Sequence, residues 1–110
     1  MFGVCESWLN DEVSNHKIRI SGFAPEPFRA DCPKANEHPR GGVCLYYKED
    51  LPIIQRKDLC RINECIITEI NRKISFVLVY RSPSQNKNEL DNFEKTWIPQ
   101  LMISIRKNRL

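Results

Sequence analysis

The sequence has few of the residues from which common metal and hydrolase sites are built. It contains two histidines, and its five cysteines include no Cys-x-x-Cys pair. Scattered cysteines of odd number favour free thiols in a reducing compartment over a disulfide framework. The spacing of Cys32, His38 and Cys44 fits no zinc pattern, and two histidines leave little material for a Ser-His-Asp site. These shortages direct attention away from zinc, disulfide and serine-hydrolase chemistry.

Long apolar runs are also missing. No stretch approaches the roughly 20 apolar residues that a membrane-spanning helix needs, and no basic-then-apolar leader is present. We therefore expect an intracellular protein, nuclear or cytoplasmic, that is neither secreted nor in a membrane. The apolar fraction of 41% and the charged fraction of 28% are ordinary for a globular domain. The net charge of +3 permits a nucleic-acid partner without requiring one.

Apolar and alternating runs predict five or six short strands. They lie at residues 2–8, 17–20, 42–48, 53–56, 64–70 and 74–80. The last two runs are joined by Asn-Arg-Lys and predict a hairpin. The run at 74–80 is apolar on both faces, which is typical of a central strand covered on both sides. Residues 24–40 carry four prolines and predict a long surface loop.

The last segment predicts a helix with one apolar stripe. That stripe consists of residues at spacings of three and four: Leu90, Phe93, Trp97, Leu101 and Ile105. Asn88 is a plausible N-cap, and Pro99 predicts a kink or two consecutive helices. One helix covers only one face of a sheet, so the strand at 74–80 lacks its second cover. We therefore expect exposed apolar surface and self-association through the uncovered sheet.

One carboxylate interrupts the first apolar run. Glu6 follows Phe2, Val4 and Cys5 and precedes Trp8. A carboxylate inside a buried strand is costly unless it is paired, solvated or bound to a metal.

Several motifs together resemble a known family. In order, they are CESWLN, ISGF, FRADCPKANEHPRGGVCLYYKEDLPI, ECIITEI, VYRSPSQ and a helix beginning NELDNFEKTW. They resemble the endonuclease domain of non-LTR retrotransposons, a branch of the endonuclease/exonuclease/phosphatase superfamily. The resemblance implies an α/β fold, a partial DNase I-like sandwich of two sheets with mostly antiparallel or mixed strands and an outer helix. It also implies hydrolysis of a DNA phosphodiester with Mg²⁺.

Five residues are candidates for the site, and the resemblance assigns a role to three of them. Glu6, in ESWL, matches the metal-binding glutamate, and Tyr80, in VYRSP, matches the active-site tyrosine. Arg29 belongs to a basic-x-acid pair in FRAD that is expected near DNA. Arg40 and Arg81 are the two further residues expected to contact nucleic acid, although solvated surface charge is the ordinary interpretation of such residues.

Other motifs of the family do not occur in these 110 residues. We find no Gly-Asp-Phe-Asn, no Ser-Asp-His and no preceding strand with the first metal-side asparagine. The expectation is a central fragment, residues 1–110, of one endonuclease domain, inactive by itself. The alternatives are a non-catalytic nucleic-acid- or protein-binding remnant, a phosphatase of the same superfamily, and a genomic remnant without selected function.

Overall fold

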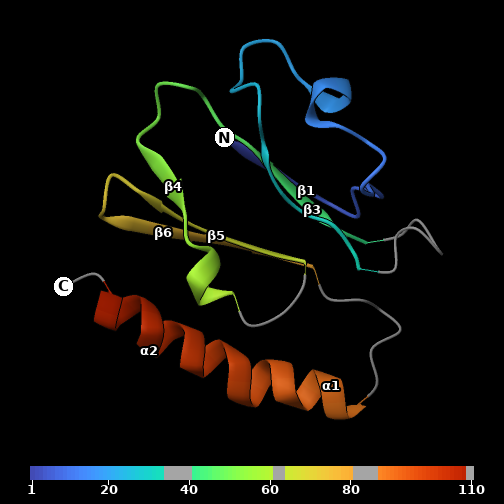
Figure 1. The fold of residues 1–110 in the computed structure, drawn as a ribbon. Helices are drawn as coiled ribbons and strands as arrows, with labels where there is room; N and C mark the ends of the chain where they lie inside the picture. The colour runs from blue at the N-terminus through green and yellow to red at the C-terminus, as the bar shows by residue number, and fades with distance from the viewer. Residues whose placement is uncertain (34–40, 61–63, 81–86, 109–110) are drawn as a thin grey trace. The chain divides into compact units, whose positions relative to one another are not determined.

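The computed structural model describes residues 1–33, 41–60, 64–80 and 87–108 (Figure 1). The chain divides into two compact units, Met1–Tyr80 and Arg81–Leu110. The first unit contains two antiparallel three-stranded sheets and the second contains the helical segment, so the protein has mixed α/β structure. Within the ranges described, no helix combines the length and the apolar character that crossing a membrane requires.

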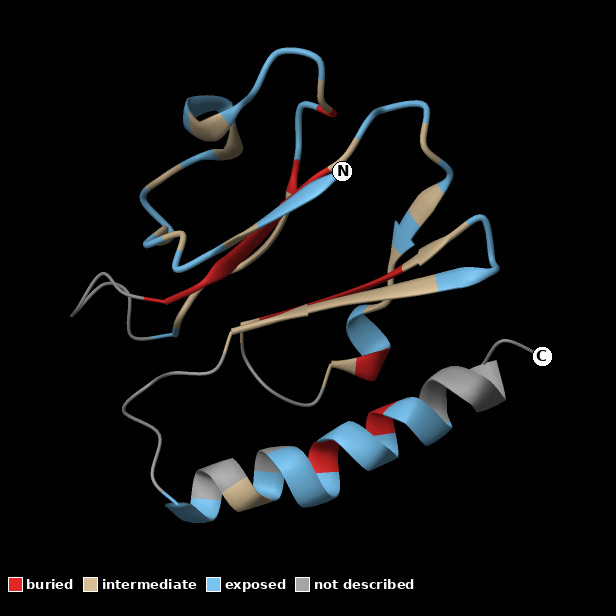
Figure 2. Ribbon diagram, turned by 180° about the vertical axis from the view of Figure 1, so that it is seen from behind, coloured by how far each residue is buried: buried red, intermediate tan, exposed pale blue. Residues whose placement is uncertain are grey.

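The first sheet has the strand order β1-β3-β2. Its strands are β1 (Phe2–Cys5), β2 (Phe28–Ala30) and β3 (Val43–Tyr46). The central strand β3 is buried along its whole length, as Figure 2 shows in red. The run at residues 42–48 therefore forms its predicted strand, over Val43–Tyr46. β2 corrects the prediction of an unbroken loop at 24–40, because three residues of that loop pair with β3.

The second sheet has the strand order β4-β5-β6. Its strands are β4 (Ile53–Gln55), β5 (Cys65–Ile70) and β6 (Ile74–Val79). The hairpin predicted for the last two runs is confirmed, with Ile70 opposite Ile74. Asn71 and Arg72 both have positive φ, 54° and 58°, as in the type I′ turns whose twist suits a hairpin.

The position predicted for the run at 74–80 is wrong within the described sheet. β6 pairs with β5 alone and is an edge strand, whereas β5 is the central strand. Cys65, Ile66, Ile67 and Thr68 of β5 are buried. One face of β6, with Phe76 and Leu78, packs against the core shared with the other sheet.

The two sheets pack face to face through a small apolar core. Val43 and Leu45 from β3 and Ile66 from β5 are fully buried at its centre. Side chains from three other strands complete the core: Phe28, Ala30, Ile53, Phe76 and Leu78. The approach is close at Gly3, where a Cβ atom would lie 2.8 Å from Cδ2 of Leu78.

The strand predicted at residues 17–20 is wrong. Asn15–Ile18 forms a single 3₁₀ turn, labelled η1 here and drawn as a short blue helix in Figure 1. The hydroxyl of Tyr46 donates a 2.7 Å hydrogen bond to the carbonyl of Ile18. A side chain thus satisfies the backbone group that a neighbouring strand would otherwise bond.

The helical segment consists of α1 (Lys87–Asn92), a π-helical stretch (Phe93–Trp97) and α2 (Ile98–Asn108). The division predicted near Pro99 is confirmed. Pro99 lies in the first turn of α2, and a proline ring clashes with the carbonyl four residues earlier in a regular helix. The wider π turn before it is a common way to accommodate such a conflict. Trp97 and Leu101, one turn apart on the predicted stripe, are buried.

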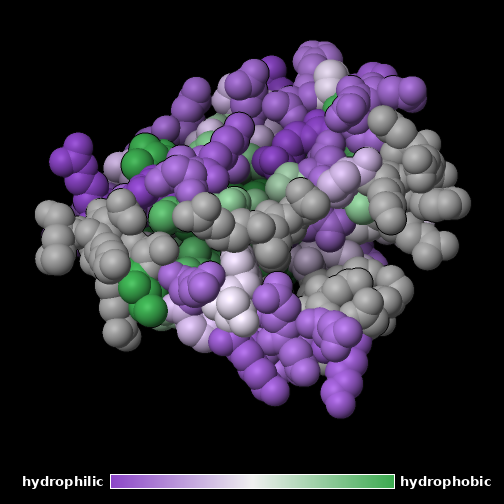
Figure 3. Space-filling model, turned by 60° about the horizontal axis from the view of Figure 1, so that its bottom comes forward, coloured by the Kyte–Doolittle hydropathy of each residue, from purple (hydrophilic) through white to green (hydrophobic). Residues whose placement is uncertain are grey.

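Apolar side chains also reach the surface. Figure 3 shows them in small groups among hydrophilic ones. On the second sheet, Ile54 is 55% exposed and Ile74 is 60% exposed. Single exposed residues of this kind are ordinary at a protein surface, so the uncovered sheet face and self-association stay predictions.

Candidate active site

Glu6 lies at the end of β1, where the chain leaves the regular sheet. The N–H groups of the next two residues, Ser7 and Trp8, donate to the carbonyls of Gly42 and Gly41 at 3.3 and 2.9 Å. Glu6 and Trp8 both have positive φ, 57° and 58°. Such a conformation is uncommon for residues other than glycine and is held here by these bonds. The side chain of Glu6 is exposed, so the carboxylate in the apolar run stands in solvent after the strand has ended.

Tyr80 immediately follows β6, and its side chain contacts Glu6. The phenolic hydroxyl donates a 2.5 Å hydrogen bond to Oε1 of Glu6. The two residues are 74 positions apart and follow strands of different sheets. The structure therefore brings together the two residues for which the resemblance implies metal-binding and active-site roles.

The environment of Tyr80 keeps its hydroxyl protonated. The pKa of Tyr80 is raised to about 12, chiefly by the hydrogen bond to Glu6, and further by burial and by the negative charges of Glu6 and Glu64. Loss of the proton would remove the hydrogen bond and place a phenolate beside carboxylates. At neutral pH Tyr80 is thus a neutral hydrogen-bond donor and not a base.

Glu64 is a site residue that the sequence reasoning missed. Its carbonyl accepts the N–H of Tyr80 at 3.1 Å, and its Oε1 accepts the N–H of Gly42 at 3.3 Å. The register of the hairpin contained the signal. Cys65 pairs with Val79, so the preceding Glu64 must lie opposite the following Tyr80.

Gly41 and Gly42 leave the space in which the side chains of Ser7, Glu64 and Tyr80 approach the backbone. Both have positive φ, 64° and 83°. A Cβ atom on Gly41 would lie 2.4 Å from Oε1 of Glu64 and 3.3 Å from Cε1 of Tyr80. A Cβ atom on Gly42 would lie 2.7 Å from Oγ of Ser7, which is buried without a hydrogen-bond partner among the described residues. The paired glycines are therefore required for the compact junction of the two sheets.

The oxygen atoms of the site could supply part of the coordination of a hard cation such as Mg²⁺. Oε2 of Glu6 has no hydrogen-bond partner in the part of the chain that the structure describes. Mg²⁺ commonly takes one or two carboxylates and keeps several waters. A cluster of three or more histidine, cysteine or acidic side chains able to hold a metal is not found among the described residues. One carboxylate oxygen is thus available, and a complete ligand shell is not.

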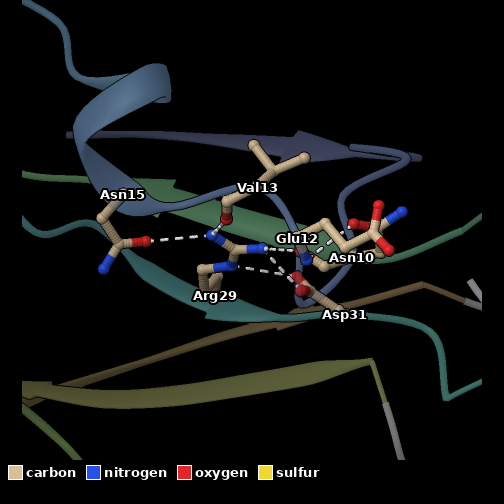
Figure 4. A network of polar contacts seen from close by, with 6 residues as sticks. All are labelled: Asn10, Glu12, Val13, Asn15, Arg29 and Asp31. Atoms are coloured by element: carbon tan, nitrogen blue, oxygen red, sulfur yellow. Dashed lines mark hydrogen bonds and ion pairs between the residues drawn. The ribbon is translucent and has the colours of Figure 1, made fainter. Parts of the chain in front are cut away.

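Arg29 is occupied inside the first unit (Figure 4). Nε and Nη2 hold both carboxylate oxygens of Asp31, at 3.1 and 2.6 Å. Nη1 donates to the carbonyl of Val13 and to Oδ1 of Asn15, and Nη2 also donates to the carbonyl of Asn10. A guanidinium has five N–H donors, and all five are used here.

These bonds give Arg29 a structural role. They join β2 to the loop at residues 10–15, and the bond to Asp31 raises the pKa of the guanidinium. No donor is left for a phosphate, so the DNA contact predicted for Arg29 stays a prediction without support from its geometry. Arg40 and Arg81, the other two predicted contacts, lie outside the described residues.

Comparison with known proteins gives no match: no family model fits the chain, and no curated protein or solved structure is significantly similar to it. Membership of the endonuclease family is therefore a proposal, and it depends on the contacts of the described residues.

Proposed function

We propose that the chain carries part of the active site of a metal-dependent DNA endonuclease with a DNase I-like fold. The observation that supports this most is the hydrogen bond between Tyr80 and Glu6. The resemblance names each residue separately, from motifs at opposite ends of an 80-residue span. Their contact at 2.5 Å is what a shared role would require. Two antiparallel sheets packed face to face are also compatible with half of a two-sheet sandwich.

In this proposal Glu6 holds the cation and Tyr80 holds Glu6. Oε2 of Glu6 is the ligand atom, because Oε1 accepts the hydroxyl of Tyr80. A hydrogen-bonded partner fixes the orientation of a ligating carboxylate and strengthens metal binding. When bound, Mg²⁺ would neutralise phosphate charge and acidify a coordinated water. Tyr80, neutral at physiological pH, can also donate to an anionic phosphate oxygen when the bond to Glu6 opens.

The 110 residues are expected to lack nuclease activity on their own. A general base and further metal ligands are needed beside Glu6, and the motifs that supply them in the family do not occur here. Groups that act on one phosphate are strongly non-additive, so the loss of one removes most of the rate.

Nicking of supercoiled plasmid tests the proposal. The purified chain should not nick with Mg²⁺ or Mn²⁺, whereas the same residues within a longer chain that carries both missing motifs should. In the longer chain, Glu6→Gln should lower Mg²⁺-dependent nicking by orders of magnitude. Equal nicking by the longer chain and by its Glu6→Gln variant would overturn the role of Glu6. Activity of the short chain that disappears in Glu6→Gln would overturn the expectation that further groups are needed.

A further inference from the structure

Trp8 is an exposed aromatic side chain next to the candidate site. Its exposed fraction is 58%, the largest of any aromatic side chain that the structure describes. Within the described ranges, no aromatic ring stacks on the indole, and the indole N–H makes no hydrogen bond. An isolated apolar residue at the surface needs no explanation by itself. The backbone of Trp8 is what makes this side chain unusual.

The backbone holds Trp8 in a conformation that bulky residues rarely adopt. Its φ is 58°, in the left-handed region. Its N–H donates to the carbonyl of Gly41 at 2.9 Å, beside the bond from Ser7 to Gly42. Outlying conformations of this kind persist where the surroundings enforce them, and they cluster at ligand sites. The same hydrogen bonds therefore fix the backbone at Trp8 and at Glu6, two residues earlier.

We propose that Trp8 is a stacking platform for an unpaired base of a DNA strand whose phosphate lies near Glu6 and Tyr80. This rests on the proposed function, because it takes DNA as the partner. An exposed ring recognises the flat face of a base, and stacking of this kind tolerates any base sequence. The base must be unpaired or displaced, since a base inside a duplex has both faces covered. The 110 residues together carry a net charge of +3, which attracts a polyanion to the chain as a whole.

The test measures binding of the whole 110-residue chain to a fluorescent eight-nucleotide oligothymidine by anisotropy, at low salt and with EDTA. EDTA removes any dependence on the metal role of Glu6, so the proposed catalysis can fail without affecting the result. Trp8→Leu, which keeps an apolar side chain but loses the ring, should weaken binding about tenfold, within the range that stacking contributes. Trp8→Tyr, which restores a flat aromatic face, should recover most of the affinity.

A second probe separates bases from phosphates. An abasic oligonucleotide of the same length and charge should bind the wild-type chain and Trp8→Leu equally, because no ring can stack on it. Far-ultraviolet circular dichroism of each variant, together with equal binding of the abasic probe, shows that folding and electrostatic attraction are unchanged.

Three results would overturn the proposal. They are equal affinity of wild type and Trp8→Leu for oligothymidine, equal affinity of the wild type for the two probes, and no binding of either probe by the wild type. A change in sedimentation of Trp8→Leu with unaltered DNA affinity would instead make Trp8 a contact between copies of the chain. Dependence of nicking on Glu6 in the longer chain tests the proposed function and does not test stacking on Trp8.

Discussion

The phenolic hydroxyl of Tyr80 donates a hydrogen bond to Oε1 of Glu6 across the junction of two sheets, with 2.5 Å between the two oxygens. The bond has a direct consequence for acid–base behaviour. It links the protonation of a tyrosine to a carboxylate that is free to bind a cation through its other oxygen. The site can therefore be examined spectroscopically in the chain as it stands, without any catalytic assay.

The first prediction concerns the titration of Tyr80. Glu6→Gln should move the pKa of Tyr80 from about 12 toward its ordinary value near 10, because the carboxylate that favours the neutral phenol is gone. Absorbance of tyrosinate during alkaline titration measures this, with Tyr80→Phe identifying the transition among the three tyrosines. Superimposable curves for wild type and Glu6→Gln would show that the negative charge of Glu6 does not act on Tyr80.

The same shift predicts how stability depends on pH. The folded pKa of Tyr80 lies above the unfolded value near 10, so the folded state holds the proton more tightly. The stabilisation is fully present below pH 10 and is lost as the pH rises through about 12. Denaturant unfolding should therefore show a steeper fall in stability between these values for wild type than for Tyr80→Phe.

The second prediction separates metal binding from folding. In Glu6→Gln the amide oxygen can still accept the hydroxyl of Tyr80, so the free energy of unfolding should change by less than about 0.5 kcal/mol. Mn²⁺ binding, followed by loss of the free-ion signal in electron paramagnetic resonance, should weaken at least about tenfold. Tyr80→Phe should weaken it less, because it removes only the group that orients Glu6. Unchanged Mn²⁺ affinity in both variants would reject Glu6 as a ligand.

The third prediction concerns Gly41. Gly41→Ala places a Cβ atom in the left-handed region and against Oε1 of Glu64, so it should destabilise the fold by more than the roughly 1–2 kcal/mol of the backbone strain alone. Gly22→Ala is the matched control. Gly22 also has positive φ, 90°, but its nearest neighbour is the flexible tip of Lys48 at 3.9 Å.

Two measurements distinguish these variants. Both should unfold at lower denaturant, with Gly41→Ala the less stable. Only Gly41→Ala should also alter the titration of Tyr80, since only there is Glu64 displaced. An altered tyrosine titration in Gly22→Ala would show that the effect is not local to the junction.

The fourth prediction concerns Arg29. Arg29→Lys cannot reproduce the fork that holds Asp31 and the loop carbonyls, and it should destabilise the chain by about 2–3 kcal/mol. Because every N–H of Arg29 is already bonded, the affinity of the folded variant for oligothymidine should stay within about twofold of wild type. A large fall in affinity with intact folding would restore the DNA contact predicted for Arg29.

The fifth prediction concerns association of the chain. β6 is an edge strand among the described residues, and edge strands with apolar side chains pair with other chains. Sedimentation velocity should show concentration-dependent dimers or larger species, and Ile74→Lys, at the exposed start of β6, should reduce them. Ile20→Lys, at an exposed position outside both sheets, is the control and should leave association unchanged. Equal association of all three chains would place the contact elsewhere.

Local sequence signals were sufficient for some of the fold. The β5–β6 hairpin could be predicted because two apolar runs flank a three-residue turn, and the helical division could be predicted from Pro99. The segment at 17–20 was predicted wrongly because the bond from Tyr46 to Ile18 joins residues 28 apart. β2 was missed because its three residues are defined by pairing with β3 and not by their own pattern.

The site, like the fold, could be predicted only in part from the sequence. Glu6 and Tyr80 were identified through the resemblance, and Glu64 could have been identified from the hairpin register. Their meeting could not be deduced from spacing, because it depends on how one sheet packs on the other. The interpretation of residues 1–110 as one fragment of a larger domain stays a prediction.

The hairpin register makes the turn at residues 71–73 part of the site, although it lies six residue pairs away. Ile70 opposite Ile74 sets Cys65 opposite Val79, and this in turn sets Glu64 opposite Tyr80. At ~3.3 Å per residue, the turn is about 20 Å from the site. Substitutions that keep its left-handed backbone should be tolerated there. A single inserted or deleted residue would instead slip one strand along the other and turn every side chain of that strand to the opposite face. The length of this distant turn must therefore be kept if Glu64 and Tyr80 are to lie opposite each other at the site.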